Sequence, residues 1–368
     1  MHTNLPSPYR VDFFNELSNY CDLTVVYERE KATNRNSAWY GNKQKKFTEK
    51  YLKGILYGEE SAFSLSLYPQ LASKKYDIRV ISGYSSLTSM FALFFLKLFK
   101  KKYVLQVDGA IGHKSSKLKE KLKAFFIKGA MAYLSTSAVT DEYLISYGAN
   151  PKKIYRYHFT SLFDGDLQKN VLTNEERMDY KQKLGINEEI AFIAVGNYIH
   201  RKGFDLLIKA SASLPKNVGV YIVGGTPTEE YIQLKNSLNL ENVHFVEHLT
   251  KEKLMEYYRA ADLCVFPTRY DIWGLIVVEA LGYGLPIITT DQCVAGLELV
   301  KDGYNGYIVP ANDSDALSKK MLEVLSSNWL TRQTYENVLD SIKEYSIENM
   351  AKDYYEIFTK LLEENLKK

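Results

Sequence analysis

Short apolar runs rich in β-branched residues alternate with helix-period segments through most of the chain. This alternation is typical of parallel sheets whose strands are joined by crossover helices. It therefore predicts a doubly wound α/β fold. The expected strands are residues 22–28, 76–82, 103–107, 131–137, 191–196, 219–225, 243–247, 262–268 and 285–290.

The chain has 368 residues, which is more than one ordinary core accommodates and favours two domains. A polar, charged stretch over residues 159–186 separates the strands of the first half from those of the second. We predict an N-terminal domain over 1–165 and a C-terminal domain over 166–345. Residues 346–368 have apolar side chains at helical spacing, so we expect one long amphipathic helix that packs back across the domains.

The first residues do not begin with a buried strand, as such a domain usually does. Residues 3–17 resemble instead the loop and helix that follow a first strand. We expect that strand to lie upstream of Met1, so that Met1 is not the true initiator. The alternative is a sheet that lacks this strand.

Composition and charge exclude several classes of protein. The net charge of +3 is too small for a broad nucleic-acid-binding surface. The three cysteines are widely separated without C-x-x-C spacing, which argues against a disulfide framework and zinc and favours a reducing cytoplasm. No apolar run reaches the roughly 18 residues of a membrane-spanning helix, and the N-terminus contains no signal-peptide core.

Two carboxylates, Asp271 and Glu279, lie in the segment RYDIWGLIVVEALGYGLPII at residues 269–288. Asp271 follows the expected strand 262–268, and ligands of open α/β sheets gather at the carboxyl ends of strands. The next helix offers its first N–H groups to an anion such as a diphosphate. Glu279 is suited to the hydroxyls of a ribose and Asp271 to those of a sugar. The alternative is that Glu279 faces solvent and Asp271 is a helix cap or loop residue.

A second candidate cluster lies in AFIAVGNYIHRKGFDLLIKA, residues 191–210. An apolar strand ends at Gly196, and the short loop before the next helix carries Arg201 and Lys202. Cations at the entrance of a βα unit are suited to phosphate oxygens. Taken alone the pair is a weak signal, because most Arg-Lys pairs are solvated surface.

Together these residues resemble the retaining nucleotide-sugar glycosyltransferases of family 4, the group 1 glycosyltransferases. Asp271 to Glu279 is similar to the family's E-x7-E motif, with Asp in place of the first Glu. ALGYGLPIITTD and KDGYNGYIVPANDSDAL resemble the stretches after the motif, and FVEHLTKEKLMEYYRAADLCVFPT the stretch before it. The resemblance is strong over residues 190–325 and looser in the N-terminal half. It implies a GT-B fold, with two Rossmann-like doubly wound domains facing across a cleft and a C-terminal helix crossing back.

The resemblance also implies roles for individual residues. Lys202 matches the lysine that holds the donor diphosphate, Glu279 the acid that holds the ribose, and Asp271 the acid near the donor sugar. Asn197 stands where the family often has Arg, so Arg201 is a candidate substitute as the second phosphate cation. The implied donor-binding set is Gly196, Asn197, Arg201, Lys202, the backbone of Trp273, Gly274 and Leu275, and Glu279.

In the first domain, SPYR at residues 7–10 resembles the family's acceptor-side loop, which makes Tyr9 and Arg10 candidates for acceptor binding. The segment QVDGAIGHK resembles the strand end that meets the reacting sugar. Asp108 is the candidate there for a polar contact in the interdomain cleft, and His113 is a further acceptor-side candidate. Either can instead be structural, since Asp-Gly is also a turn signal.

The family implies front-face transfer with retention, in which the leaving phosphate assists deprotonation of the acceptor hydroxyl. No nucleophile stands out for a covalent intermediate, so stabilisation of the leaving group carries most of the effect. The D-x-D triplets at 164–166 and 313–315 match the metal signature of another glycosyltransferase fold, but we interpret both as structural. We expect no metal and no cofactor. The catalytic candidates are Asp271, Glu279, Lys202 and Asp108.

Residues 90–103 and 117–129 combine apolar side chains with clustered lysines, a surface that can lie on an anionic membrane. The first segment can equally be a core helix with a basic cap. Both fall in the expected acceptor domain, which favours peripheral attachment at the inner face of the cytoplasmic membrane and a lipid-linked acceptor. The polar loop 32–47 carries Trp39 and Tyr40, which can stack on acceptor sugars unless the loop is simply mobile.

The sequence thus predicts a hexosyltransferase that moves a sugar from a UDP- or GDP-linked donor to a saccharide acceptor in bacterial capsule, exopolysaccharide or O-antigen synthesis. Two alternatives stay open. One is a sugar-nucleotide epimerase or phosphorylase of the same fold, although no lysine is placed for a cofactor Schiff base. The other is a non-catalytic protein that binds nucleotide sugars. The base, the sugar, the acceptor and the linkage depend on a few hydrogen bonds that one chain does not specify.

Overall fold

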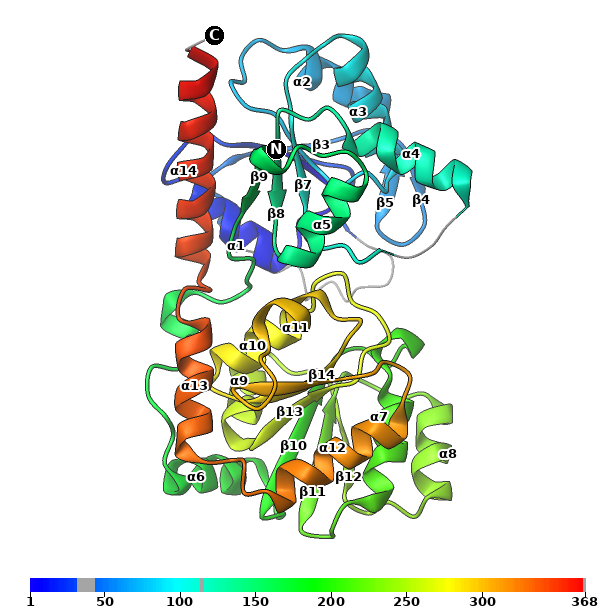
Figure 1. Ribbon diagram of the computed structural model, residues 1–368, viewed down its shortest axis with the longest axis vertical. Helices are drawn as coiled ribbons and strands as arrows, with labels where there is room; N and C mark the ends of the chain where they lie inside the picture. The colour runs from blue at the N-terminus through cyan, green and yellow to red at the C-terminus, as the bar shows by residue number, and fades with distance from the viewer. Residues whose placement is uncertain (32–43, 113–115, 367–368) are drawn as a thin grey trace. The chain divides into compact units, whose positions relative to one another are not determined.

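The protein consists of two compact units. The computed structural model describes residues 1–31, 44–112 and 116–366, except the side chains of 365 and 366. Unit 1 comprises Met1–Ser161 together with Ser346–Lys368, and unit 2 comprises Leu162–Tyr345. The chain therefore leaves unit 1 after Ser161, where we had predicted a boundary after residue 165, and returns to it with the C-terminal helix (Figure 1).

Unit 1 contains a parallel sheet of seven strands in the order β3-β2-β1-β6-β7-β8-β9. The inner strands β2, β7 and β8 are buried at every residue, as expected for a parallel sheet covered on both faces. A separate antiparallel hairpin pairs β4 with β5. The strands are β1 (His2–Thr3), β2 (Thr24–Tyr27), β3 (Thr48–Tyr51), β4 (Ile55–Tyr57), β5 (Ser61–Phe63), β6 (Val80–Ser82), β7 (Val104–Val107), β8 (Ala132–Ser135) and β9 (Ile154–Arg156).

The first strand, β1, is only two residues long, yet it lies inside the sheet. His2 pairs with Val26 of β2 on one side and with Ile81 of β6 on the other. His2 and Thr3 therefore fill the position for which we expected a strand upstream of Met1, and the alternative of a sheet without this strand is wrong. Two residues are too few for a strand pattern to show in the sequence.

Serine caps start three of the helices of unit 1. The side-chain oxygens of Ser86, Ser116 and Ser137 accept hydrogen bonds from backbone N–H groups in the first turns of α3, α4 and α5. Each serine lies just before its helix and so determines where that helix begins. The helices are α1 (Pro8–Leu17), α2 (Tyr68–Ala72), α3 (Leu87–Leu98), α4 (Lys117–Ile127), α5 (Ala138–Ser146) and α14 (Ile347–Leu366).

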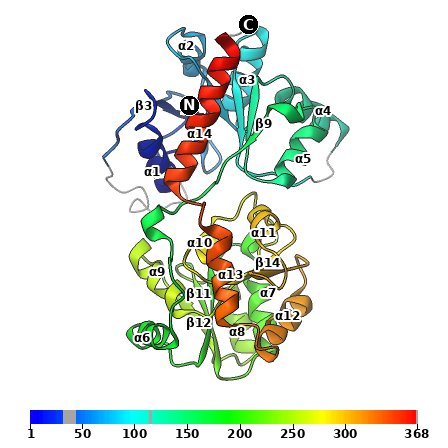
Figure 2. The ribbon, with the colours of Figure 1, turned by 60° about the vertical axis from the view of Figure 1, so that its left-hand side comes forward.

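Helix α14 packs along α1 (Figures 1 and 2). Its Tyr354 is fully buried, with ring centroids 4.8 Å from Phe13 of α1 and 4.9 Å from Tyr157, which follows β9. Aromatic pairs at these distances contribute beyond their buried area. The apolar stripe of the C-terminal segment thus joins the core of unit 1.

Unit 2 contains a parallel sheet of six strands in the order β12-β11-β10-β13-β14-β15. Strand β10 pairs with β11 on one side and with β13 on the other, so the strand order reverses between β10 and β13. Open α/β sheets bind ligands at such a reversal, outside the carboxyl ends of the strands. The strands are β10 (Ile190–Val195), β11 (Val218–Val223), β12 (Val243–Val246), β13 (Leu263–Phe266), β14 (Ile287–Thr290) and β15 (Gly306–Val309).

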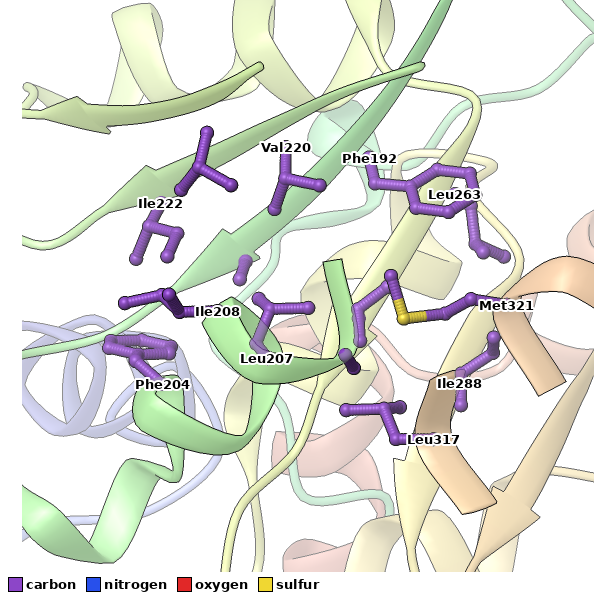
Figure 3. Packing of buried hydrophobic residues seen from close by; sticks show 14 of the residues in the cluster. Phe192, Phe204, Leu207, Ile208, Val220, Ile222, Leu263, Ile288, Leu317 and Met321 are labelled. Carbon is purple, nitrogen blue, oxygen red and sulfur yellow. The ribbon is translucent and has the colours of Figure 1, made fainter. Parts of the chain in front are cut away.

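The hydrophobic core of unit 2 anchors helix α7 directly after β10. Phe204, Leu207 and Ile208 of α7 are fully buried in one cluster with Ile222 of β11 and Met321 of α12 (Figure 3). The loop between β10 and α7 is therefore anchored at both ends. The helices are α6 (Asn174–Leu184), α7 (Phe204–Ala210), α8 (Glu229–Ser237), α9 (Lys251–Ala260), α10 (Leu275–Gly282), α11 (Val294–Leu299), α12 (Ser314–Ser326) and α13 (Arg332–Ile342).

Candidate functional site

The candidate site of unit 2 begins where β10 ends, at Gly196. This residue has φ +147°, and a β-carbon there would lie 3.3 Å from Cε of Lys202. Glycine therefore lets the aliphatic part of Lys202 pass close to the end of the strand. Asn197, the next residue, has its carbonyl in a tight turn and accepts a hydrogen bond from the N–H of Ile199 at 2.8 Å.

The loop that carries Arg201 and Lys202 is a 3-10 turn, His200–Lys202, pressed against the end of β13. Gly203 ends this turn with φ +71°, and a β-carbon there would lie 2.1 Å from the carbonyl oxygen of Pro267. No other residue fits at Gly203 without moving one of the two loops. The packing sets the position of both cations.

Side chains on the neighbouring strand ends clamp the same loop. Arg269 donates to both carboxylate oxygens of Asp205 at 2.7 Å, and its backbone N–H donates to the carbonyl of Arg201 at 2.8 Å. Thr268 Oγ1 also donates to the carbonyl of Arg201, at 3.0 Å. Sequence reasoning missed this clamp. In the sequence, the only sign of it was an acid, Asp205, in the segment after β10 and a base, Arg269, in the segment after the neighbouring strand β13.

Asp271 lies between the two predicted phosphate-binding cations. Its Oδ2 accepts hydrogen bonds from Arg201 Nη1 and from Lys202 Nζ, both at 2.8 Å. Burial alone raises the pKa of the Asp271 carboxyl, but the charges of Lys202 and Arg201 outweigh this and hold the pKa below its usual range. Two cations share one carboxylate, so the cluster retains a surplus positive charge.

The backbone from Asp271 to Gly274 is held by α11 and by the segment just before it. Asp271 N–H donates to the carbonyl of Gln292 at 2.9 Å, and Ala295 N–H donates to that of Trp273 at 2.8 Å. Gly274 has φ +101°, and a β-carbon there would lie 2.6 Å from Sγ of Cys293. The Trp273 side chain is buried, so this loop contributes its backbone, not this side chain, at the start of α10. Helix α10 begins at Leu275, and no side chain caps its first turn.

Glu279 lies one turn into α10 and is half-buried. Tyr258 of α9 donates its hydroxyl to Glu279 Oε2 at 3.4 Å, and the Tyr258 ring stacks on Tyr283 at 5.2 Å. Burial, together with the charge of Glu279, raises the pKa of Tyr258 well above its usual value, so the phenol stays protonated as a donor. The structure thus places Glu279 beside α9.

In unit 1, Asp108 lies just after β7 at the carboxyl edge of the sheet. Its carboxylate forms a salt bridge with Arg10 and accepts hydrogen bonds from Gln106 Nε2 and Tyr157 Oη, each at 2.6 Å. Burial lowers the pKa of the Arg10 guanidinium, but the pair with Asp108 overcomes this and raises it. The structure therefore brings Asp108 and Arg10 together as an ion pair, a contact that the sequence did not predict.

The remaining acceptor-side candidates divide into two groups. Tyr9 is half-buried, with its ring 5.9 Å from that of Phe159. His113, Trp39 and Tyr40 lie outside the described residues.

Both D-x-D triplets have partners within unit 2. Asp166 Oδ2 accepts from the N–H of Phe163 at 2.8 Å and from Lys251 Nζ at 2.5 Å. Asp313 Oδ1 accepts from the N–H of Ala316 at 2.8 Å and caps α12. Across residues 1–31, 44–112 and 116–366, no three His, Cys, Asp or Glu side chains are grouped as metal ligands.

Comparison with known proteins assigns unit 2 to a family. Residues 176–340 match the family model described as glycosyl transferases group 1. Unit 2 is a group 1 glycosyltransferase domain. The residues predicted for donor binding, from Gly196 to Glu279, all lie inside the matched segment.

Curated relatives share this domain at low identity. An uncharacterized glycosyltransferase of Methanocaldococcus jannaschii is 27% identical over 195 residues, 51% of this chain and 49% of the relative. The lipopolysaccharide glucosyltransferase WaaG of Escherichia coli is 34% identical over 139 residues, 36% of this chain and 34% of the relative. The chain thus spans about half the length of the relatives that it matches, or less.

Solved structures resemble the whole chain. Sucrose-phosphate synthase of Thermosynechococcus elongatus has a TM-score of 0.74 at 18% identity and covers 97% of this chain and 93% of its own. HepE of Anabaena, solved with UDP, has a TM-score of 0.75 at 15% identity and covers 98% of both chains. At such identities the likeness shows the fold alone, and it confirms the predicted GT-B architecture with two Rossmann-like domains.

Proposed function

We propose that this protein is a glycosyltransferase that moves a sugar from a nucleotide-sugar donor to a saccharide acceptor. The observation that carries the proposal is the cluster of Arg201, Lys202 and Asp271 beside the start of α10, within a group 1 glycosyltransferase domain. Its surplus positive charge and the uncapped helix start are both suited to a diphosphate.

The proposed donor is a nucleoside diphosphate sugar, bound with its diphosphate on Lys202 and Arg201. Asp271 is then placed to accept hydrogen bonds from sugar hydroxyls, and Glu279 to accept them from the ribose. HepE structures contain UDP and UDP-glucose, which supports a uridine donor over the guanosine alternative. Asn197 takes no part as a cation, and Arg201 supplies the second positive charge in its place.

We propose a retaining, metal-independent reaction. As the glycosidic bond to the diphosphate breaks, negative charge grows on the leaving phosphate, and Lys202 and Arg201 stabilise that charge. The same phosphate takes the proton of the acceptor hydroxyl on the face where the new bond forms. Positioning and electrostatic stabilisation then carry the rate, and no side chain forms a covalent intermediate.

The proposed acceptor is a lipid-linked saccharide, in capsule, exopolysaccharide or O-antigen synthesis at the inner face of the cytoplasmic membrane. WaaG, by name a lipopolysaccharide glucosyltransferase, is among the relatives, which supports an acceptor of this class. On the acceptor side, the ion pair of Arg10 and Asp108 is proposed to shape the wall of the acceptor site, with Tyr9 next to it.

The test is a panel of UDP- and GDP-linked sugars, with release of nucleoside diphosphate measured with and without lipid-linked saccharides. We expect Lys202→Ala and Glu279→Ala to lower the rate about 100-fold or more, since each removes a contact to the donor. Lys216→Ala and Glu241→Ala, which change exposed residues of unit 2, serve as matched controls and should leave the rate unchanged.

Other outcomes separate the alternatives. Tight nucleotide binding without turnover on any donor favours a non-catalytic binding protein, and sugar interconversion without an acceptor favours an epimerase. An inverted anomeric configuration in the product, read by proton NMR, contradicts retention. Loss of activity in EDTA that Mg²⁺ or Mn²⁺ restores contradicts metal independence.

A further inference from the structure

Two neighbouring helices of unit 1 expose apolar side chains that the core does not use. Leu98 lies four positions after Phe94 on the first helix, and the exposed residues of the second recur at spacings of four and three, which places each set on one side of its helix. Phe99 follows the first helix directly. All of these residues are between 44% and 76% exposed, whereas Leu93, Leu96 and Phe126 on the inner sides of the same helices are buried. The exposed residues, which we call the α3–α4 face, are Phe94, Leu98, Phe99, Leu118, Leu122 and Phe125.

The two stripes join into one surface. The rings of Phe94 and Phe125 lie 6.4 Å apart between centroids, and Lys97 Nζ donates to the carbonyl of Lys128 at 2.6 Å. Figures 1 and 2 show α3 and α4 next to each other in both views. Contiguous exposed apolar patches of this kind mark interaction surfaces rather than scattered exposure.

Lysines surround this face. Residues 87–128 contain ten lysines and only two acidic residues, Asp108 and Glu120, a net charge of +8 in a chain whose total is +3. Asp108 is committed to Arg10. The exposed lysines of the segment are Lys100, Lys102, Lys117, Lys119, Lys121 and Lys128.

We infer that the α3–α4 face docks on an anionic lipid bilayer. Phenylalanine and leucine side chains insert at the level of the headgroups and upper acyl chains, while the lysines reach the anionic headgroups. No helix in the described part of the chain is both long and apolar enough to cross a bilayer. Contact through this face is therefore attachment to one leaflet.

The charge of the face favours a bilayer over a second copy of the chain. In a two-fold symmetric dimer, the same surface patch meets itself. The six exposed lysines of each chain would then lie close to those of the other, and like charges brought together repel. The inference deepens the proposed function, because it assigns the surface that brings unit 1 to a lipid-linked acceptor.

Vesicle co-sedimentation of the full chain tests the docking. We expect binding to phosphatidylcholine vesicles that contain 30% phosphatidylglycerol, at least about tenfold tighter than to phosphatidylcholine alone and weakened by NaCl. Leu98→Ser with Leu118→Ser should lower the affinity about tenfold, because both leucines are largely exposed and lose apolar contact. Lys117→Gln with Lys121→Gln should lower it by a similar factor.

Matched controls are Met178→Ser, an exposed apolar residue of α6, and Lys216→Gln, both in unit 2. The inference is overturned if the face variants bind vesicles as tightly as the controls do, if the wild type binds neutral and anionic vesicles equally, or if it binds no vesicles. It is also overturned if light scattering shows a dimer that the face variants dissociate. UDP binding, measured by calorimetry, should be unchanged in all these variants. A chain that binds UDP but no vesicle refutes the docking alone, and one that binds vesicles but no nucleotide refutes the proposed function alone.

Discussion

Asp108 in unit 1 and Asp271 in unit 2 have similar surroundings, since each follows an inner strand of a parallel sheet and each lies beside an arginine. Asp108 has one cationic partner, Arg10, and two neutral donors, and the Arg10 side chain is only 7% exposed. Asp271 has two cationic partners on one oxygen, and the Arg201 side chain is 43% exposed. The first cluster is neutral and its carboxylate accepts hydrogen bonds from three side chains, whereas the second retains a positive charge that reaches solvent.

The comparison distinguishes an anchor from a binding site. A buried ion pair whose charges cancel holds local structure and offers no net charge to an anionic ligand. A carboxylate shared by two cations keeps those cations close together, and they remain able to bind a more highly charged anion such as a diphosphate. An aspartate at the carboxyl edge of a parallel sheet therefore has a different role in each unit, according to the charge around it.

The largest expected effect is on stability, through Asp108. Asp108→Ala leaves the guanidinium of Arg10 buried without its charge partner, and we expect the free energy of unfolding to fall by about 3–5 kcal/mol. Urea unfolding followed by circular dichroism measures this. Asp164→Ala is the control, since its pair with Lys169 is more than half exposed and should cost less than about 1 kcal/mol. Similar losses for the two variants would remove the distinction between anchor and site.

A smaller effect of opposite sign is expected at Asp271. Asp271→Asn removes the anion that competes with a diphosphate for Lys202 and Arg201, so UDP affinity by calorimetry should rise about threefold or more. Sugar transfer should fall, because the proposed acceptor of sugar hydroxyls loses its charge. Weaker UDP binding, as expected for Lys202→Ala, would show that Asp271 organises the cations rather than competing for them.

Asp271→Glu sharpens the same comparison, because the family has the longer acid at this position. Unchanged donor preference and rate in this variant would show that the missing methylene is incidental. A changed preference would place the Asp271 carboxylate in contact with the sugar.

The smallest expected effect is a pH dependence. The pKa of Asp271 is lowered in the folded state, so its contribution to stability is complete above the unfolded pKa of about 3.9 and is lost as the pH falls through the folded value. The difference in the free energy of unfolding between the wild type and Asp271→Asn should stay constant from pH 8 to about 5 and shrink below about 4. Urea titrations across this pH range measure this difference. A difference that grows at acid pH would contradict a lowered pKa of Asp271 in the folded state.

Much of the fold was predictable, because strands buried on both faces carry the signal in their own residues. All nine expected strands exist, among them β10 and β13, which carry the site. Six strands were missed: the two-residue inner strand β1, and the edge strands β3, β4, β5, β9 and β15. Edge strands are partly exposed, as in the polar run Thr48–Tyr51, so their sequences lack a continuous apolar run.

The candidate site was predictable as residue types, but not as a network. The sequence places Arg201 and Lys202 after one strand and Asp271 after another, and the structure joins them at 2.8 Å. The clamp between Asp205 and Arg269 went unnoticed, since 64 residues separate its partners. Asp108 was a candidate polar contact, and only the structure reveals that Arg10, Gln106 and Tyr157 use its carboxylate.

The sequence by itself determined the order of strands and helices, because burial imposes a local pattern that each segment carries alone. It also determined where the cations and carboxylates lie along the chain. Only the tertiary structure decided which carboxylate pairs with one cation and which with two. Electrostatic pairing depends on distances of a few ångströms between residues far apart in sequence, and those distances exist only once the strands lie side by side.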